Sequence, residues 1–387
     1  MERQSELRGK ALLFLLFLWC VWFINFSVRM VFSPILPLIE DEFMINHARA
    51  SSIYVFQSTG YAFALLFSGI YAGRFGYKRS IMVSLCISAF VSLWIPYTQA
   101  FPFLYVANFL LGFSVGIYLP SAIALITEYF AEKNWGKALA IHDSGSSTGI
   151  FCAPFVALLL LHFVKWRGIF AIFGVIFLAA AVVFYLVADE VKVTHPRKTA
   201  FGSLVKMPAV WILGILCIAA AGAALGVFFT VPLYLTKELN LSIDYASSVL
   251  GISRVGGICV SISFSFFIDR VNLRKAMFIL MLITGILTAI IGWVPVRLIW
   301  IVLFLQSMCV TGLFPAAFLL IARMFRGEIR SMATGFITAL SIAFGAGGIP
   351  YLLGLSGDHL GFSFGFVILG IAVSLSSPLV FTLKELK

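Results

Sequence analysis

The chain has 387 residues, of which 61% are hydrophobic and only 11% are charged. This composition excludes a set of soluble domains and indicates an integral membrane protein that contacts a lipid bilayer. The net charge of +11 would suit nucleic acid. The basic residues are spread over short loops between apolar segments, however, so we expect no nucleic-acid partner.

Breaks rich in charge or turn residues divide the sequence into twelve apolar segments, each long enough to cross a bilayer as a helix. We place these spans at residues 11–38, 50–73, 80–98, 102–130, 138–163, 168–188, 208–235, 245–268, 276–294, 298–325, 332–355 and 362–383. The sequence therefore predicts an all-α membrane protein with 12 transmembrane helices.

The distribution of lysine and arginine sets the expected orientation. With both termini in the cytoplasm, twenty of the 27 basic residues lie on the cytoplasmic side, five lie outside, and Arg29 and Arg254 lie within spans. Because short cytoplasmic loops carry an excess of positive charge, we predict that both termini are cytoplasmic. The N-terminal MERQSELRGK has no small-residue cleavage site after it, so we interpret it as a cytoplasmic tail.

The first span contains an arginine within an apolar helix. Inserting such a charge at mid-membrane costs about 2.5–3.5 kcal/mol, so intramembrane charges usually mark a pathway or a binding site. Asn25, Arg29 and Ser33 follow one another at every fourth position and share one helix face. We expect this face to line protein or water.

The two halves of the chain repeat each other weakly, with an offset near 196 residues. Gly149 and Pro154 in the fifth span return as Gly345 and Pro350 in the eleventh. A basic linker at 189–207 separates the halves, so we expect one bundle of six helices at 1–188 and a second at 208–387. An offset of half the chain is typical of a duplicated transporter.

The loops after the second and eighth spans carry a shared motif. The first reads Gly69-x₃-Gly73-Arg74-x-Gly76-x-Lys78-Arg79, and the second contains Asp269, Arg270, Arg274 and Lys275. This pattern resembles the loop motif of the major facilitator superfamily of secondary transporters. Gly73 stands where that family has aspartate, and Asn272 stands where it has glycine.

The resemblance implies two pseudo-symmetric six-helix bundles that work by alternating access. The first span is also similar to that of the organophosphate antiporters and their organic-anion relatives, in which an arginine precedes a proline-containing outer end, as Arg29 precedes Pro34 and Pro37. This chain departs from those antiporters in two places. They carry a second arginine in the seventh span, where this chain has Ala223 to Phe229, and a histidine in the fifth span, where it has Ser146. The resemblance thus implies anion binding without naming the anion.

Arg29 and Arg254 have matching depths in the two halves. Each lies nine residues from the outer end of its span, which is ~13–14 Å at ~1.5 Å per residue and close to the bilayer midplane. Guanidinium groups suit a bidentate hold on carboxylate or phosphate, so we predict that both bind an anionic substrate. The alternative is that each arginine is a structural charge held by a carboxylate or by helix carbonyls.

The fifth span contains the neighbouring pair His142 and Asp143, about one turn from its cytoplasmic end. Histidine titrates near neutrality, and a carboxylate within a span can take up a proton. Either residue is therefore a candidate for proton coupling. The alternative is an interfacial ion pair or a helix cap.

Further polar residues within the spans are candidates for contact with the substrate. They are Asn25, Gln57, Tyr61, Asn108, Tyr118 and Gln306. Buried amides hold helices together as often as they bind ligands, and that alternative stays open for each of them.

The sequence gives no sign of other chemistry. It has no phosphate-binding loop, no nucleophile–base arrangement, and no metal-binding spacing among its six cysteines, so we expect no enzymatic activity, metal or cofactor. We predict a monomeric, multi-pass protein of a cell membrane, with a bacterial inner membrane favoured. Its predicted function is proton-coupled symport or exchange of a small organic anion, and the alternative is a multidrug or hydrophobic-compound exporter.

Overall fold

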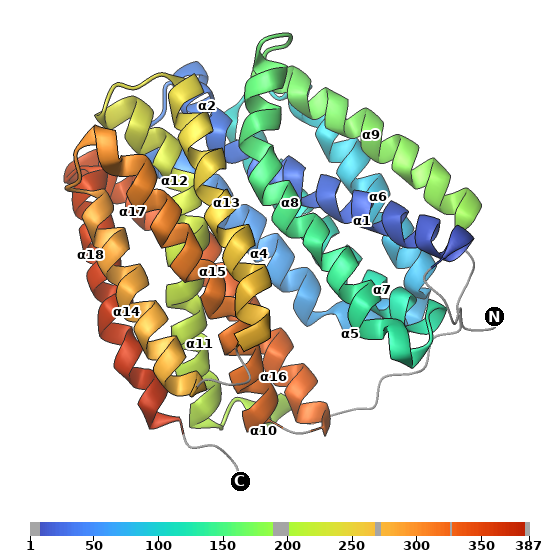
Figure 1. The fold of residues 1–387 in the computed structure, drawn as a ribbon. Coiled ribbons are helices and arrows are strands. Elements are labelled where there is room, and N and C mark those ends of the chain that lie inside the picture. Colours follow the sequence, from blue (N-terminus) through green and yellow to red (C-terminus); the bar gives the residue numbers. More distant parts are fainter. Residues whose placement is uncertain (1–7, 189–200, 268–271, 326, 384–387) are drawn as a thin grey trace. The chain divides into compact units, whose positions relative to one another are not determined.

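The computed structural model describes residues 8–188, 201–267, 272–325 and 327–383, and within these ranges the chain forms helices joined by turns, with no strand (Figure 1). A helix lies over each of the twelve expected spans. The predicted all-helical class is therefore confirmed for the described residues.

The first half of the chain contains the helices for spans 1–6. They are α1 (Gly9–Met30), α2 (Phe32–Phe43), α3 (His47–Ser51), α4 (Ile53–Leu66), α5 (Ser68–Phe75), α6 (Tyr77–Trp94), α7 (Phe101–Tyr129), α8 (Trp135–Leu161) and α9 (Trp166–Val187). Spans 1 and 2 are each built from more than one helix. Span 3 is α6 followed by the 3₁₀ turn η1 (Ile95–Tyr97), and spans 4, 5 and 6 are single long helices.

The second half contains the helices for spans 7–12, preceded by a short helix, α10 (Phe201–Leu204). They are α11 (Pro208–Ala221), the π-helix η3 (Gly222–Gly226), α12 (Val227–Leu233), the π-helix η4 (Tyr234–Glu238), α13 (Ile243–Phe267), α14 (Leu273–Ile291), α15 (Ile299–Met324), α16 (Gly327–Leu340), the π-helix η7 (Ser341–Gly348), α17 (Ile349–His359) and α18 (Phe362–Ser376).

Ten helical stretches in the described part of the chain are long and apolar enough to cross a membrane. They cover every expected span except 50–73 and 245–268. The first of these is divided among α3, α4 and α5, the longest of which has 14 residues. The second corresponds to α13, which has 25 residues.

The first helical stretch is longer than the sequence predicts. It runs from Gly9 to Phe43 over 35 residues, whereas the expected span ends at 38. Glu40 and Asp41, which the sequence places beyond the span, therefore lie on α2. Pro37 does not end the helix.

Contacts between Cα atoms divide the chain into two compact units. Unit 1 contains Met1–Phe32 and Thr59–Arg197, and unit 2 contains Ser33–Ser58 and Lys198–Lys387. In unit 1, α1 packs on α8, and α6 packs on α7 and α9. In unit 2, α11 packs on η7, and α14 packs on α15 and α18. In the first half, span 1 thus packs on span 5, and span 3 packs on spans 4 and 6. The second half repeats this pattern, with span 7 on span 11 and span 9 on spans 10 and 12.

Two equivalent glycines allow the matching helices to approach each other closely. A Cβ atom on Gly149 of α8 would lie 2.9 Å from the carbonyl oxygen of Phe23. A Cβ atom on Gly345 of η7 would lie 2.6 Å from the carbonyl oxygen of Ile218. The sequence repeat at these positions therefore corresponds to the same packing contact in each unit.

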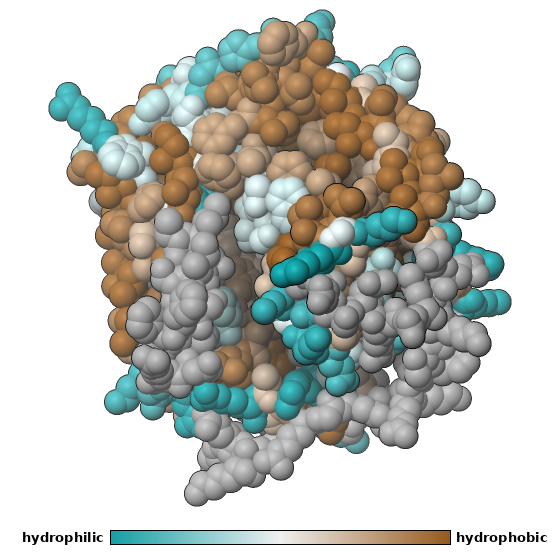
Figure 2. All heavy atoms as spheres, turned by 45° about the vertical axis from the view of Figure 1, so that its right-hand side comes forward, coloured by the Kyte–Doolittle hydropathy of each residue, from teal (hydrophilic) through white to brown (hydrophobic). Residues whose placement is uncertain are grey.

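Large apolar side chains remain exposed on the outer helices. On α9, Val175, Val182 and Leu186 are each more than half exposed, and broad apolar areas cover much of the face shown in Figure 2. Exposed apolar surface of this extent is a liability in water and is expected where lipid covers the protein.

Candidate functional site

Arg29 is buried near the end of α1, with 2% of its surface exposed. Its guanidinium carbon lies 4.8 Å from the ring centre of Tyr61 and 5.5 Å from that of Phe26. Its Nε and Nη1 atoms have no hydrogen-bond partner among the described residues. Because an uncompensated buried charge is costly, these donors are suited to an anionic ligand.

Asn25 and Ser33, which share the polar face of the first span with Arg29, make different hydrogen bonds. Asn25 donates from Nδ2 to the carbonyl of Val21 at 3.0 Å, and its buried Oδ1 has no partner in the described structure. In unit 2, Ser33 donates to the carbonyl oxygen of Phe228 at 2.6 Å. Ser33 is thus committed to packing against α12, whereas Asn25 keeps an acceptor that a ligand can use.

Arg254 lies on α13 and is half-buried. Its Nη2 donates to the carbonyl oxygen of Ala224 at 3.4 Å, and its guanidinium carbon lies 4.7 Å from the ring centre of Phe228. Its Nε has no partner among the described residues. The protein therefore satisfies part of this guanidinium with a backbone carbonyl, and the remainder is free for a ligand.

The carbonyl that Arg254 contacts belongs to the π-helix η3. Gln306, on α15, donates from Nε2 to the neighbouring carbonyl of Ala223 at 2.8 Å and to Thr288 Oγ1 at 3.2 Å. A π-turn leaves carbonyls without their usual helical donors, and such turns are frequent at functional sites. Gln306 thus supports the backbone next to Arg254 through its amide nitrogen.

The polar groups of unit 1 include a buried aromatic stack around His142. The imidazole lies 5.6 Å from the Trp22 ring and 5.9 Å from the Tyr118 ring, measured between centres. Tyr118 donates its hydroxyl proton to the carbonyl of Leu18 at 2.9 Å, and His142 Nε2 lies 3.1 Å from the same hydroxyl. Since Tyr118 has one proton to donate, His142 Nε2 must be the donor to Tyr118.

Three other predicted residues lie in different surroundings. Asp143, next to His142 on α8, has an exposed side chain. Gln57 and Asn108 are fully buried, and Asn108 donates from Nδ2 to the carbonyl of Leu104 in its own helix at 2.9 Å. Of these three, only Asp143 carries a titratable group.

The loop motif of the first half has a conformational basis at Gly76, between α5 and α6. Gly76 has φ of 83°, in the region that favours glycine, and its carbonyl accepts from the backbone and the hydroxyl of Ser80. In the second half, Asn272 has φ of −67° and accepts from the backbone of Lys275 through its side chain. A capping asparagine thus takes the place of the glycine.

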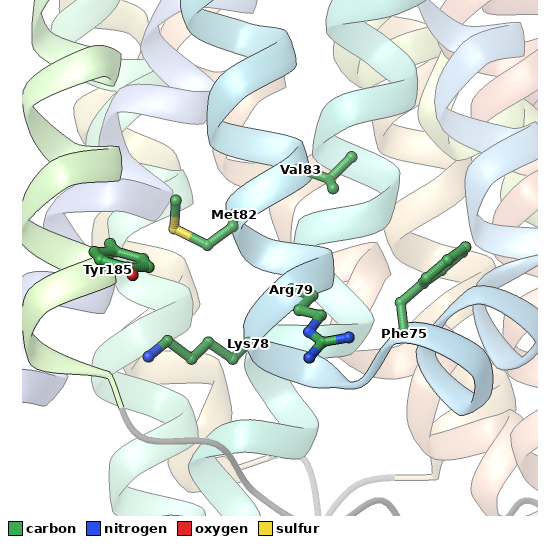
Figure 3. Close-up of a pocket in the computed structure, with 6 residues that line it drawn as sticks. All are labelled: Phe75, Lys78, Arg79, Met82, Val83 and Tyr185. Carbon is green, nitrogen blue, oxygen red and sulfur yellow. The ribbon is translucent and has the colours of Figure 1, made fainter.

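The other motif residues lie beside this turn or outside the described residues. Gly69 and Arg74 lie on α5. Arg79 contributes with Lys78 to a cavity of about 620 Å³ beside α6, in which Lys78 extends toward Tyr185 of α9 (Figure 3). Asp269 and Arg270 lie outside the described residues.

The structure also contains an ionic cluster that the sequence did not predict. It consists of Glu40 and Asp41 of α2, His47 of α3, Lys237 of η4 and Asp358 of α17, all in unit 2. No spacing in the sequence identifies it, because its members come from positions as far as 311 residues apart. The acidic end of the first span is the one local signal.

Comparison with known proteins identifies the family. The sequence model of the Major Facilitator Superfamily matches residues 18–297 and 234–386. The chain belongs to the major facilitator superfamily. The resemblance first found in the loop motif is therefore confirmed, and the chain is a multi-pass membrane protein of a family of transporters.

The chain is similar to several bacterial transporters along most of its length. It is 22% identical to a gallate transporter of Pseudomonas putida, over 95% of this chain and 86% of that protein. It is 24% identical to the 4-hydroxybenzoate transporter PcaK of Pseudomonas aeruginosa, over 81% of this chain and 78% of that protein. The bacterial origin of these relatives supports a location in a bacterial inner membrane.

Solved structures of the same fold extend the likeness to three dimensions. A bacterial homologue of the human lysosomal transporter Spinster superposes with a TM-score of 0.80 at 14% identity, covering 98% of this chain and 97% of that one. The nucleoside transporter NupG also gives a TM-score of 0.80 at 14% identity, with 95% and 99% covered. At this identity the likeness concerns the fold.

Proposed function

We propose that this protein is a secondary active transporter that moves a small organic anion across the membrane by alternating access. The observation that carries the proposal is Arg29, a buried guanidinium with two nitrogens that no described residue satisfies. Arg254 is the corresponding cation of the second half and retains one unsatisfied nitrogen. Together they neutralise the substrate, and Asn25 and Tyr61 complete the surroundings of Arg29.

The proposal includes a full membrane topology. The chain crosses the bilayer twelve times with both termini in the cytoplasm, in two bundles at 1–188 and 208–387 joined by the linker at 189–207. The excess of basic residues on the proposed cytoplasmic side and the repeated helix pairings of the two units support this arrangement. We propose that a single chain is the transporting unit.

The substrate class follows from the cations and their neighbours. The similar transporters are named for gallate, 4-hydroxybenzoate, hexuronate and sulfoacetate, which are all small organic acids. Both arginines also lie over aromatic rings, those of Tyr61 and Phe26 and that of Phe228. Flat rings beside a guanidinium suit an aromatic carboxylate, so we propose aromatic acids as the preferred anions.

Uptake of an anion into a negatively charged interior requires coupling. Each charge moved against the potential costs about 2.3 kcal/mol per 100 mV, so the substrate travels with protons or in exchange for another anion. Asp143 and His142 are the candidate proton acceptors on α8. The exposed side chain of Asp143 supports it as the more accessible of the two.

Transport by the purified protein in liposomes tests this proposal. We expect an inward proton gradient to drive uptake of radiolabelled 4-hydroxybenzoate or gallate, with weaker uptake of hexuronate and sulfoacetate. Arg29→Ala and Arg254→Ala should each reduce uptake. Arg297→Ala, which removes an exposed cation from the loop before α15, should not, and it serves as the matched control.

Two other outcomes would contradict this proposal. Export of a lipophilic cation without uptake of any organic acid would favour the multidrug exporter. Uptake that is unaffected by replacing either arginine would show that the anion binds elsewhere.

A further inference from the structure

Asn25 is a fully buried amide on α1, and its two polar atoms have different surroundings. Its Nδ2 donates to the carbonyl oxygen of Val21, one turn earlier, at 3.0 Å. Because a carbonyl oxygen can only accept, the amide nitrogen has to be the atom that faces Val21. Oδ1 therefore faces away from this carbonyl, and it has no partner among the described residues. Asn25 thus presents a buried acceptor that lacks a donor.

The neighbours of Asn25 on α1 supply no donor for this oxygen. Trp22 and Phe26 place their ring centres 4.8 Å apart in an edge-to-face contact. Since Oδ1 has no partner among the described residues, neither Trp22 Nε1 nor the guanidinium of Arg29 donates to it. A buried acceptor without a donor is costly, and a ligand group that donates a hydrogen removes this penalty.

Arg29 offers the opposite kind of group on the same face of α1. Its Nε and Nη1 are donors without an acceptor among the described residues. Asn25 and Arg29 are four residues apart, so they lie on one helix face and about 6 Å apart along its axis. A carboxylate, which only accepts, suits Arg29, whereas a group that donates suits Asn25. The face therefore favours a ligand with a carboxylate and a donor about one helical turn apart.

An aromatic ring is a suitable spacer between these two groups. The ring of Tyr61 lies 4.8 Å from the guanidinium carbon of Arg29, and that of Phe26 lies 5.5 Å from it. Flat rings pack well against such neighbours. A benzene ring that carries its carboxylate and its hydroxyl at opposite ends separates them by a distance comparable to one helical turn.

We propose that Asn25 is a specificity-determining residue, which accepts a hydrogen bond from a ring hydroxyl of the aromatic acid while Arg29 binds its carboxylate. This inference rests on the proposed function and narrows its substrate class to aromatic acids with a donor opposite the carboxylate. An acid without that donor leaves Oδ1 unsatisfied and binds more weakly. A substituent that can only accept faces Oδ1 as a second acceptor and binds most weakly.

Four benzoates that differ only opposite the carboxylate test this preference. 4-Hydroxybenzoate and 4-aminobenzoate carry a donor there, benzoate carries none, and 4-methoxybenzoate carries an acceptor alone. Equilibrium binding to the full-length protein in detergent, followed by uptake into liposomes, would compare them. We expect the two donors to bind about 5–150-fold more tightly than benzoate, and 4-methoxybenzoate to bind most weakly.

Asn25→Leu removes the acceptor at nearly constant size. The carbonyl of Val21 keeps its helical backbone donor, so we expect this variant to fold. The variant should lose the preference for 4-hydroxybenzoate and bind benzoate about as well as the wild-type protein does. Comparing both ligands in both proteins cancels the intrinsic difference between the two acids and isolates the contact of Asn25 with the hydroxyl.

Ser27→Ala is the matched control on the same helix. Ser27 is buried and donates to the carbonyl oxygen of Phe23, one turn earlier, at 2.8 Å. Its hydroxyl, unlike Asn25 Oδ1, is not left without a partner. Ser27→Ala should therefore keep the wild-type preference for the hydroxylated acid.

The possible results are distinct. Equal binding of 4-hydroxybenzoate and benzoate by the wild-type protein, or a preference that persists in Asn25→Leu, would overturn the role of Asn25. If Arg29→Ala still weakened both acids in that case, the proposed anion site would stand without it. A preference that depends on Asn25, without uptake of any of the four acids, would retain Asn25 as the hydroxyl acceptor and refute the proposed transport.

Discussion

Arg29 and Arg254 occupy equivalent depths in the sequence, yet their surroundings differ. Arg29 is enclosed by the rings of Tyr61 and Phe26, and two of its nitrogens have no partner among the described residues. Arg254 is half-buried and already donates to a carbonyl of the π-helix η3. The backbone thus provides an acceptor for part of the second guanidinium, whereas Nε and Nη1 of the first have no acceptor among the described residues.

The largest expected effect is therefore at Arg29. Hydrogen bonds to charged groups contribute about 1.5–3 kcal/mol each, so Arg29→Ala should lower kcat/KM for uptake about 10–100-fold. Arg29→Lys should recover only part of this loss, because lysine keeps the charge without the planar pair of donors. Initial rates of 4-hydroxybenzoate uptake over a concentration series, with Arg297→Ala as control, would measure both. Wild-type kinetics in Arg29→Ala would show that the unsatisfied nitrogens of Arg29 do not bind the transported anion.

Arg254→Ala should have a smaller effect, about tenfold or less, and it should act mainly on KM. The loss is smaller because part of this guanidinium is already held by Ala224. If both arginines bind the same anion, the double variant should be less impaired than the sum of the two free-energy changes predicts. Strict additivity would indicate that the two arginines do not share a ligand.

A third prediction concerns the support that Gln306 gives to the π-helix η3. Gln306→Leu leaves the carbonyl of Ala223 and the hydroxyl of Thr288 without their donor, and should lower the free energy of unfolding by about 1–3 kcal/mol. Ser121→Ala in α7 is the matched control, because its hydroxyl bonds only a carbonyl of its own helix. Thermal unfolding in detergent would compare the two. Equal stability of both variants would show that η3 needs no such support.

Part of this arrangement could be predicted from the sequence. The twelve helical ranges followed from apolar length, and the two arginines stood out because a charge is rare within a span. Gly149 and Gly345 recurred at the offset of the repeat, and in the structure each lies at a close helix contact. Each of these signals is local or repeats at a fixed offset.

Other features left no such signal. The π-helix η3 differs from an α-helix by one hydrogen-bond register, and its residues, Gly222–Gly226, fit either helix. The pairing of Gln306 with Ala223 joins residues 83 apart, and that of His47 with Asp358 joins residues 311 apart. Contacts of this range depend on tertiary packing, which apolar periodicity does not specify.

The last prediction, whose Tyr61→Phe variant has the smallest expected effect, separates the ring of Tyr61 from its hydroxyl. A cation over an aromatic face gains about 0.5–2 kcal/mol, so Tyr61→Leu should weaken anion binding about 2–30-fold by loosening Arg29. Tyr61→Phe keeps the ring and should remain within about twofold of wild type on the same reasoning. Equilibrium binding of labelled substrate to the detergent-purified variants would measure both. A loss in Tyr61→Phe as large as that in Tyr61→Leu would mean that the hydroxyl binds the anion directly, so that the first half would hold its ligand through two groups and the second through Arg254.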